Sequence, residues 1–248
     1  MAPMRIAMWS GPRNISTAMM RSFGSRPDTA VIDEPFYAVF LAGTGIDHPM
    51  RDEVLKAQPT DWREVEQVLL GPVPDGREVF YQKHMTHHML EVIGRDWMSE
   101  CRNAFLIRPP EQVLASYAAK RQSVTMQEIG FVQQAELFDR VADRLGAAPP
   151  VVEAQDVLAD PRGTLGALCA ALDIPFCDEM LSWPTGRRAT DGVWAPVWYD
   201  AVERSTGFSA PRPGATLDDL DDRLKPLAEE ARPHYERLAA HRLKPAPG

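Results

Sequence analysis

The segment Ser10–Thr17, with the sequence SGPRNIST, follows a short apolar run and precedes a helical pattern. Gly11 permits a tight turn here, and the free backbone N–H groups at a helix start favour an anion. Ser16 and Thr17 add hydroxyl donors, and Arg13 adds a planar, charged guanidinium that suits phosphate or sulfate oxygens. The segment lacks the Gly-Lys pair of nucleoside-triphosphate loops. It predicts an anion site; the alternative is an ordinary strand-to-helix turn in which Ser16 caps the helix.

A second arginine and a second hydroxyl group occur in the segment LIRPPEQVLASY. Arg108 ends an apolar run that is typical of a strand, and Ser116 lies eight residues later, in the helical pattern that follows. An arginine and a hydroxyl group in these places can hold a second phosphate beside the first. The two segments together therefore predict a site for a ligand that carries two anionic groups.

Two places in the sequence could supply a general base. Glu34 follows the apolar run TAVID, and three histidines follow EVFYQK, with Lys83 directly before them: His84, His87 and His88. Histidine titrates near neutral pH, which suits proton removal, and the lysine could assist a leaving phosphate. The alternatives are that the histidines cap a helix or pack at a surface, and that Glu34 ends a strand and pairs with a basic loop.

The histidines also raise the question of a metal site. His84 and His88 have the i, i+4 spacing of zinc ligands on a helix. No third ligand stands out in the sequence, so we expect no metal.

These residues need a framework that brings them together. Apolar runs predict strands at 5–9, 29–33, 78–83, 103–108 and within PPVVEAQDVL (149–158). Helical patterns lie between them: from about residue 16, over most of 36–70 with breaks at Gly43–Gly45 and near Pro59, in HHMLEVI (87–93), after residue 108, over about 125–145 and over 161–173. The alternation predicts an α/β fold of three layers, with a central, mostly parallel sheet flanked by helices. Ligands in such sheets bind beyond the carboxyl ends of the strands, where Ser10–Thr17, Asp33–Phe36, Lys83–His88 and Arg108–Ser116 would converge.

The last third of the chain lacks the strand-and-helix alternation of the first two thirds. Residues 176–216 carry many Pro, Gly and aromatic residues, and we expect an irregular flap there. Its aromatic residues are Trp183, Trp194, Trp198, Tyr199 and Phe208. They could cover a bound base or wall a pocket, or form a small cluster that pins the loop. Residues 217–242 read as a helical segment, interrupted near Pro226 and Pro233. We expect a single domain over 1–248.

Because it carries both anion motifs, the sequence resembles the sulfotransferases that use 3′-phosphoadenosine 5′-phosphosulfate. These sulfotransferases have a P-loop-like fold. GPRNIST is similar to their loop for the 5′-phosphosulfate, with Arg13 where most members have Lys. RPPEQVLAS is similar to their motif for the 3′-phosphate. The resemblance implies that the donor is held by Gly11, Pro12, Arg13, Asn14, Ile15, Ser16, Thr17, Arg108 and Ser116, and that no metal is required.

The sequence departs from the family pattern in two places. YQKHMTHHM stands where the family's KTHLP-like catalytic segment is expected, and the late glycine-rich basic segment is missing. ERSTGFSAPR could replace the latter through Arg204, Thr206, Gly207 or Arg212, and we place Thr206, Gly207 and Phe208 in the donor site. Because some bacterial members use a Glu near the position of Glu34, this residue and His84 are equal candidates for the base. Lys83, Arg13 and His88 complete the predicted catalytic set.

The resemblance implies transfer of a sulfuryl group to a hydroxyl group or amine of a small-molecule acceptor. An atypical P-loop kinase and a nucleotide-binding relative without catalysis are the alternatives. The net charge of −8 argues against nucleic acid or a membrane surface as partner. Three cysteines without a CxxC pair predict reduced thiols and a cytoplasmic protein. A homodimer is an arrangement that the sequence leaves open.

Overall fold

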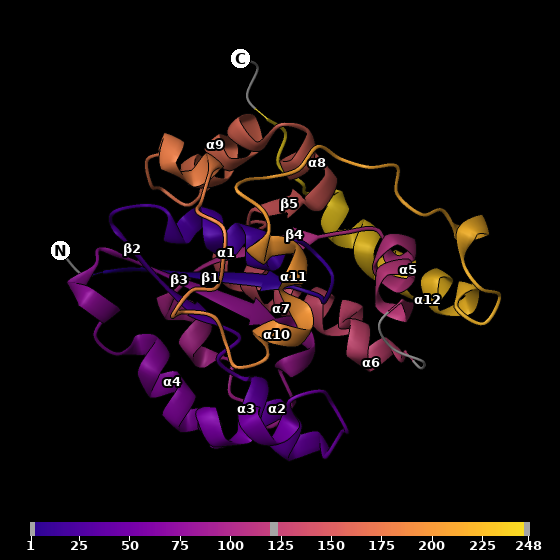
Figure 1. The fold of residues 1–248 in the computed structure, drawn as a ribbon, viewed down its shortest axis with the longest axis horizontal. Helices are drawn as coiled ribbons and strands as arrows, with labels where there is room; N and C mark the ends of the chain where they lie inside the picture. The colour runs from indigo at the N-terminus through magenta and orange to yellow at the C-terminus, as the bar shows by residue number, and fades with distance from the viewer. Residues whose placement is uncertain (1–2, 120–123, 246–248) are drawn as a thin grey trace.

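The computed structural model describes residues 3–119 and 124–245. Within this part of the chain, five parallel strands form one sheet in the order β2-β3-β1-β4-β5 (Figure 1). The strands are β1 (Met4–Ser10), β2 (Thr29–Asp33), β3 (Val79–Met85), β4 (Arg102–Ile107) and β5 (Val151–Glu153). The predicted α/β fold with a parallel sheet is confirmed, and the first four predicted strands agree with the observed ones to within two residues.

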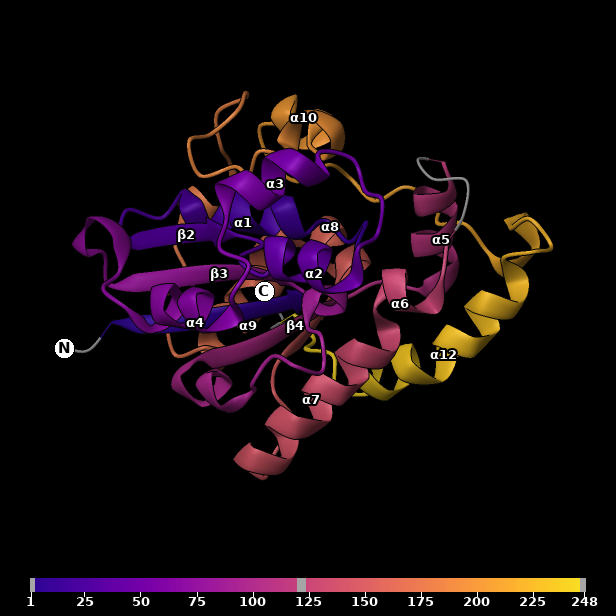
Figure 2. The same cartoon turned by 90° about the horizontal axis from the view of Figure 1, so that it is seen from below.

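Helices cover both faces of the sheet (Figures 1 and 2). Those between the strands are α1 (Ser16–Gly24), α2 (Tyr37–Thr44), α3 (Arg51–Ala57), α4 (Trp62–Leu70), α5 (Pro110–Ala118), α6 (Met126–Ile129) and α7 (Phe131–Leu145). After β5 come α8 (Ala154–Ala159), α9 (Pro161–Ala171), α10 (Ala195–Trp198), α11 (Asp200–Glu203) and α12 (Lys225–Ala239). Short 3₁₀ turns are η1 (Pro74–Gly76), η2 (Thr86–His88), η3 (Asp96–Glu100), η4 (Asp178–Leu181) and η5 (Leu217–Asp219).

The alternation of side chains along β1 explains the three layers. Ile6 and Met8 pack into the core under α1, α8 and α9, whereas Ala7 and Trp9 pack into the core under α4, α7 and α12. Successive side chains of a strand point to opposite faces, so a strand covered on both faces must be apolar throughout. β1 is the central strand of the sheet, and Ile6 to Trp9 are fully buried.

Several predicted boundaries were wrong for local reasons. HHMLEVI forms only the turn η2 followed by irregular chain, and the strand in PPVVEAQDVL ends at Glu153, where α8 begins. Gly130, with φ at +69°, divides the predicted helix 125–145 into α6 and α7. Pro226 starts α12, but Pro233 lies inside it without ending it. A proline in a helix removes one main-chain hydrogen bond, which this long helix tolerates.

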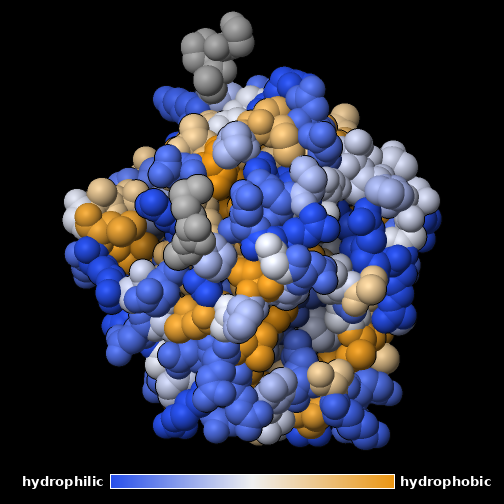
Figure 3. Space-filling view, turned by 90° about the vertical axis from the view of Figure 1, so that its left-hand side faces the viewer, coloured by the Kyte–Doolittle hydropathy of each residue, from blue (hydrophilic) through white to orange (hydrophobic). Residues whose placement is uncertain are grey.

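The face at which the strands begin is not where the predicted ligand segments lie. Figure 3 shows this face, which is mainly hydrophilic with separate hydrophobic patches. A cleft of about 670 Å³ opens at this end, lined in part by Arg102, Asn103 and Pro150 at the starts of β4 and β5. The four predicted ligand segments follow the opposite ends of the strands. No helix in the described residues is both long and apolar enough to cross a membrane.

Candidate active site

The loop between β1 and α1 is held in an unusual backbone conformation. Arg13 and Ile15 have positive φ angles of 59° and 42°, which cost on the order of 1–3 kcal/mol each in non-glycine residues. The Asn14 side-chain amide donates to the carbonyl of Leu106 at the end of β4, over 2.7 Å, and so fastens the loop. A Cβ at Gly11 would lie 2.9 Å from the carbonyl oxygen of Ile129, so glycine is required at this close approach.

The start of α1 has no side-chain cap within the described residues. Ile15 occupies the cap position, and Ser16 is the first helical residue. The alternative in which Ser16 caps the helix is therefore wrong. The backbone N–H groups at this helix start remain available to an anion, as the anion-site prediction requires.

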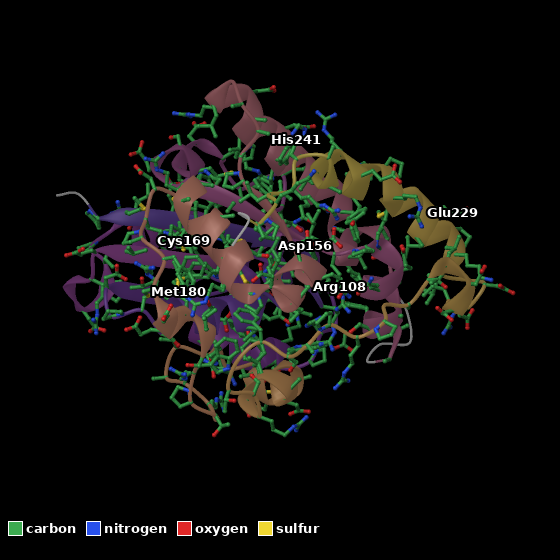
Figure 4. The ribbon with its side chains drawn as sticks, turned by 90° about the horizontal axis from the view of Figure 1, so that it is seen from above. Arg108, Asp156, Cys169, Met180, Glu229 and His241 are labelled. Carbon is green, nitrogen blue, oxygen red and sulfur yellow. The ribbon has the colours of Figure 1, made fainter. Side chains whose placement is uncertain are left out.

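Arg13 and Arg108 lie side by side beside this loop. Arg108 Nη1 donates to the main-chain carbonyl of Arg13 over 2.7 Å, and Arg13 Nε donates to Ser116 Oγ on α5 over 3.0 Å. Arg108 Nε also donates to Gln112 over 3.2 Å, and Gln155 of α8 donates to the same amide oxygen. Figure 4 shows Arg108 between α5 and α8. The structure thus brings together the arginines of both predicted anion motifs and Ser116, the hydroxyl of the second motif.

The two guanidinium groups carry charges that the described residues do not balance. Neither has a carboxylate within ion-pair distance in the described part of the chain. Burial lowers the pKa of both arginines, and the charge of Arg13 lowers that of Arg108 further. Two adjacent, partly desolvated cations without a counter-ion are stable only where an anion or water molecules bind to them.

Across β3 from this loop lies a buried cluster of charged groups. Lys83 Nζ donates to Asp33 Oδ1 over 2.9 Å, to Tyr199 Oη over 3.0 Å and to Glu34 Oε1. Asp33 ends β2, Glu34 follows it, Lys83 belongs to β3, and Tyr199 comes from the flap. Glu34 has a positive φ of 42°, as Arg13 and Ile15 do. Strained backbone is thus found in two of the four predicted ligand segments, Ser10–Thr17 and Asp33–Phe36.

The protonation states in this cluster follow from its charges. Burial alone lowers the pKa of Lys83, but the carboxylates of Asp33 and Glu34 outweigh it and raise that pKa well above its ordinary value. Lys83 is therefore an ammonium ion. Burial raises the pKa of Glu34, and Lys83 beside it lowers that pKa in part. Glu34 is consequently more basic than an exposed glutamate, which suits a group that accepts a proton near neutral pH.

His84 in β3 and His87 and His88 in η2 are buried and neutral. Burial and the charge of Lys83 lower the pKa of His84 to about 3, and His87 also has a pKa of about 3, for which burial is the main cause. Burial lowers the pKa of His88 well below its ordinary value as well. The ring of His84 stacks on Trp9 with centroids 4.4 Å apart, and that of His88 stacks on Tyr37 at 4.5 Å. Within the described residues, Nδ1 of each histidine has no hydrogen-bond partner.

The predicted flap is irregular and lies partly over the charged cluster. Tyr199 reaches Lys83, and Trp194 is fully buried beside it. Thr206 and Gly207 instead pair with the chain around Ser182 and Trp183, and Phe208 packs edge-on against Trp183. Of these last three, only Phe208 shares a hydrophobic cluster with a residue of the loop between β1 and α1, Ile15.

The contacts of Asp33 with the flap, and the salt bridge between Arg21 and Asp191, have no signal in the sequence. Asp33 accepts hydrogen bonds from Lys83, Tyr199 and the main-chain N–H of Gly192, and Arg21 of α1 forms a paired salt bridge with Asp191. Tyr199 and Asp191 lie more than 150 residues from their partners. Nothing local in the sequence marks such long-range contacts.

Residues 4–242 match the sequence model of the family described as "Sulfotransferase domain". The chain belongs to this family. It is 37% identical over 251 residues to "Branched-chain-amino-acid aminotransferase-like protein 1" of Arabidopsis thaliana. This alignment covers 99% of this chain and 44% of the relative. It is also 37% identical over 238 residues to "Branched-chain-amino-acid aminotransferase-like protein 2" of the same plant, in an alignment that covers 95% of this chain and 41% of the relative. The chain thus spans less than half the length of these curated relatives.

Solved sulfotransferase domains share the fold. The "Sulfotransferase Domain from the Curacin Biosynthetic Pathway" superposes with a TM-score of 0.54 at 15% identity, covering 96% of this chain and 98% of that one. The "Sulfotransferase Domain from the Synechococcus PCC 7002 Olefin Synthase" gives 0.53 at 17% identity, covering 96% and 95%. Family membership implies the donor 3′-phosphoadenosine 5′-phosphosulfate. Among the described residues, no group of three or more His, Cys, Asp or Glu side chains could hold a metal ion.

Proposed function

We propose that this protein transfers the sulfuryl group of 3′-phosphoadenosine 5′-phosphosulfate to a hydroxyl group or amine of a small acceptor. The observation that carries the proposal is the pair Arg13 and Arg108. These partly buried guanidinium groups lack a carboxylate among the described residues and lie beside a helix start without a side-chain cap. The donor has anionic groups at both ends of its ribose, which suits two neighbouring cationic sites.

The residues fit the donor in two parts. The loop Gly11–Thr17 and Arg13 would take the 5′-phosphosulfate, since backbone N–H groups and a guanidinium are suitable donors to its oxygens. Arg108 and Ser116 would take the 3′-phosphate. Arg13 Nε already lies 3.0 Å from Ser116 Oγ, so the two parts adjoin.

Glu34 is our candidate for the general base. It follows β2, and the donor loop follows β1, with β3 between these two strands. Two strand spacings correspond to about 10 Å, which leaves room for a sulfuryl group and an acceptor oxygen. As the acceptor oxygen bonds to sulfur, its proton would pass to a Glu34 oxygen, and the bond from sulfur to the 5′-phosphate oxygen would break. Developing charge on that phosphate would be stabilised by Arg13 and the loop N–H groups.

Asp33 and His84 are weaker candidates for the same role. Both oxygens of Asp33 accept hydrogen bonds, and its side chain is 1% exposed, against 11% for Glu34. His84 has a pKa of about 3 and is enclosed by aromatic rings. A base with so low a pKa removes a proton poorly near neutral pH.

Calorimetric titration with 3′-phosphoadenosine 5′-phosphate, without metal, tests the donor site against ATP with Mg²⁺. We expect micromolar binding of the bisphosphate, weakened in Arg13→Ala and Arg108→Ala and retained in Arg63→Ala, which removes an exposed arginine. Labelled donor would then serve for an acceptor screen. A clear preference for Mg²⁺–ATP would support the kinase alternative. Bisphosphate binding without turnover, unaffected by Glu34→Gln, would support a relative without catalysis.

A further inference from the structure

The hydroxyl group of Tyr199 lies at the centre of the charged cluster. It donates to the carboxylate of Asp33, whose oxygens are 2.9 and 2.7 Å away. It accepts from Lys83 Nζ over 3.0 Å and from the indole N–H of Trp194 over 3.1 Å. One hydroxyl hydrogen and two lone pairs are thus all in use, and the side chain is buried.

The segment that carries Tyr199 is fastened to the sheet at two further points. The main-chain N–H of Gly192 donates to Asp33 Oδ2 over 3.0 Å. The carboxylate of Asp191 receives both terminal nitrogens of Arg21, over 2.6 and 2.7 Å, with both side chains almost fully buried. Figure 2 shows α10, which directly precedes Tyr199, beside α3. The buried Trp194, Ala195 and Tyr199 pack in one hydrophobic cluster with residues of α2 and α3. Tyr199 is therefore held in place independently of its own bonds.

The hydrogen bonds of Lys83 define what Tyr199 does. An ammonium group has three hydrogens, and those of Lys83 go to Asp33, Glu34 and Tyr199. Tyr199 takes one hydrogen of Lys83 and supplies one to Asp33, so that Asp33 does not depend on the lysine alone. Lys83 can then remain bonded to Glu34.

We propose that Tyr199 is a positioning residue of the candidate active site, whose hydroxyl group orients Lys83 and Asp33 so that Glu34 is the carboxylate presented to the acceptor. This inference rests on the proposed function for the role of Glu34. Without the hydroxyl group, Asp33 loses a donor and draws the ammonium group toward itself. Glu34 then loses part of its contact with Lys83, and its charged form is less stabilised.

The carboxyl titration of Glu34 tests this arrangement in the free protein. ¹³C labelling of the glutamate carboxyl carbons, with Glu34 assigned by its absence in Glu34→Gln, gives the pKa directly. The titratable groups that face Glu34 are Asp33, Lys83 and Tyr199. In Tyr199→Phe we expect the pKa of Glu34 to rise by about one unit, because Lys83, drawn toward Asp33, then stabilises the Glu34 carboxylate less. An unchanged titration in folded Tyr199→Phe would overturn the proposal.

Ser205→Ala is the matched control. It removes two hydrogen bonds within the same flap, the 3.0 Å bond from Trp183 Nε1 to Ser205 Oγ and the 2.8 Å bond from Ser205 Oγ to the carbonyl of Val202, without touching the charged cluster. We expect its Glu34 titration to equal that of the parent protein. An equal shift in Ser205→Ala would show general loosening of the flap and would contradict a specific role for Tyr199.

Turnover and donor binding separate this inference from the proposed function. With an acceptor found by screening, Tyr199→Phe should lower kcat by about tenfold and leave the affinity for the bisphosphate unchanged. If the bisphosphate does not bind even the parent protein, the proposed function fails, whereas the titration still decides whether Tyr199 orients the cluster. A shift of the titration with kcat unchanged would overturn the positioning role.

Discussion

The guanidinium group of Arg108 donates to the main-chain carbonyl of Arg13 over 2.7 Å, although the two residues are 95 positions apart. This bond holds the loop between β1 and α1 in a conformation in which Arg13 has a positive φ. It also places two positive charges next to each other, each lowering the stability of the other. The repulsion between the two charges lowers the stability of the folded protein, and a bound anion would offset this loss.

The contact predicts that the two arginines act together on ligand binding. Arg13→Ala and Arg108→Ala should each weaken binding of 3′-phosphoadenosine 5′-phosphate by roughly 10- to 100-fold, the effect of losing a hydrogen bond to a charged group. The double variant should lose less than the sum of the two free-energy changes, because Arg108 also holds the loop of Arg13. Calorimetry on the four proteins at one salt concentration measures this coupling. Strict additivity would contradict a shared site.

Substitution of Glu34 should separate catalysis from binding. Glu34→Gln keeps the shape of the side chain but removes its basicity, so we expect turnover to fall by roughly 10²- to 10⁴-fold with bisphosphate affinity unchanged. His84→Asn should retain turnover wherever the protein stays folded. Steady-state kinetics with the screened acceptor gives both values. If His84→Asn is the variant that loses turnover, the base is the histidine.

The pH dependence of turnover gives a second test of Glu34. Its pKa is raised by burial, and only the carboxylate accepts a proton, so the rate should fall as the pH falls through this raised value. The fall should therefore begin at higher pH than the ordinary glutamate value of 4.5. Measurement of kcat/KM over an acidic pH series locates it. A profile that is flat down to that ordinary value would argue against Glu34 as the base.

Much of the framework was predictable because it depends on local patterns. The apolar runs of β1 to β4 and the helix after each anion motif mark strand and helix by composition and period alone. The convergence of Arg13, Arg108, Glu34 and Lys83 then follows from the topology of a parallel sheet. The strand in PPVVEAQDVL was overestimated, because Ala154 and the residues after it are equally consistent with a helix.

The interior of the site was less predictable, because it depends on long-range contacts and burial. Nothing in KHMTHH indicates that three histidines are enclosed by Trp9, Tyr37 and Phe40 from other elements. Nor does the sequence show which flap aromatic residue reaches Lys83. Tyr199 does so only because Asp33 and Gly192 bring the flap to the end of β2.

The buried histidines should make stability depend on pH. His84 and His87 have a pKa of about 3 in the folded protein, against 6.5 for an unperturbed histidine. Below pH 6.5 the histidines of the unfolded chain bind protons that the buried histidines of the folded protein do not. The free energy of unfolding therefore keeps their full contribution above pH 6.5 and declines from there toward pH 3. Each histidine contributes a slope of about 1.4 kcal/mol per pH unit across this range.

Urea unfolding at several pH values between neutral and acidic tests this expectation. His84→Gln should reduce the slope by the contribution of one histidine. A parent protein whose free energy of unfolding does not decline with acidification would contradict the burial of neutral histidines.

The salt bridge between Arg21 and Asp191 should govern how firmly the flap is attached. Its side chains are 2% and 0% exposed, so Arg21→Met would leave a buried carboxylate without its partner and should cost about 3–5 kcal/mol. The exposed pair Arg162–Asp178 is the control, since Arg162→Met should have no measurable effect on unfolding. Because the double variant Arg21→Met, Asp191→Leu removes both buried charges, it should recover part of the lost stability in urea unfolding. If the single Arg21→Met variant is as stable as the parent, the flap is held by its other contacts, including those of Tyr199 and Gly192 with Asp33.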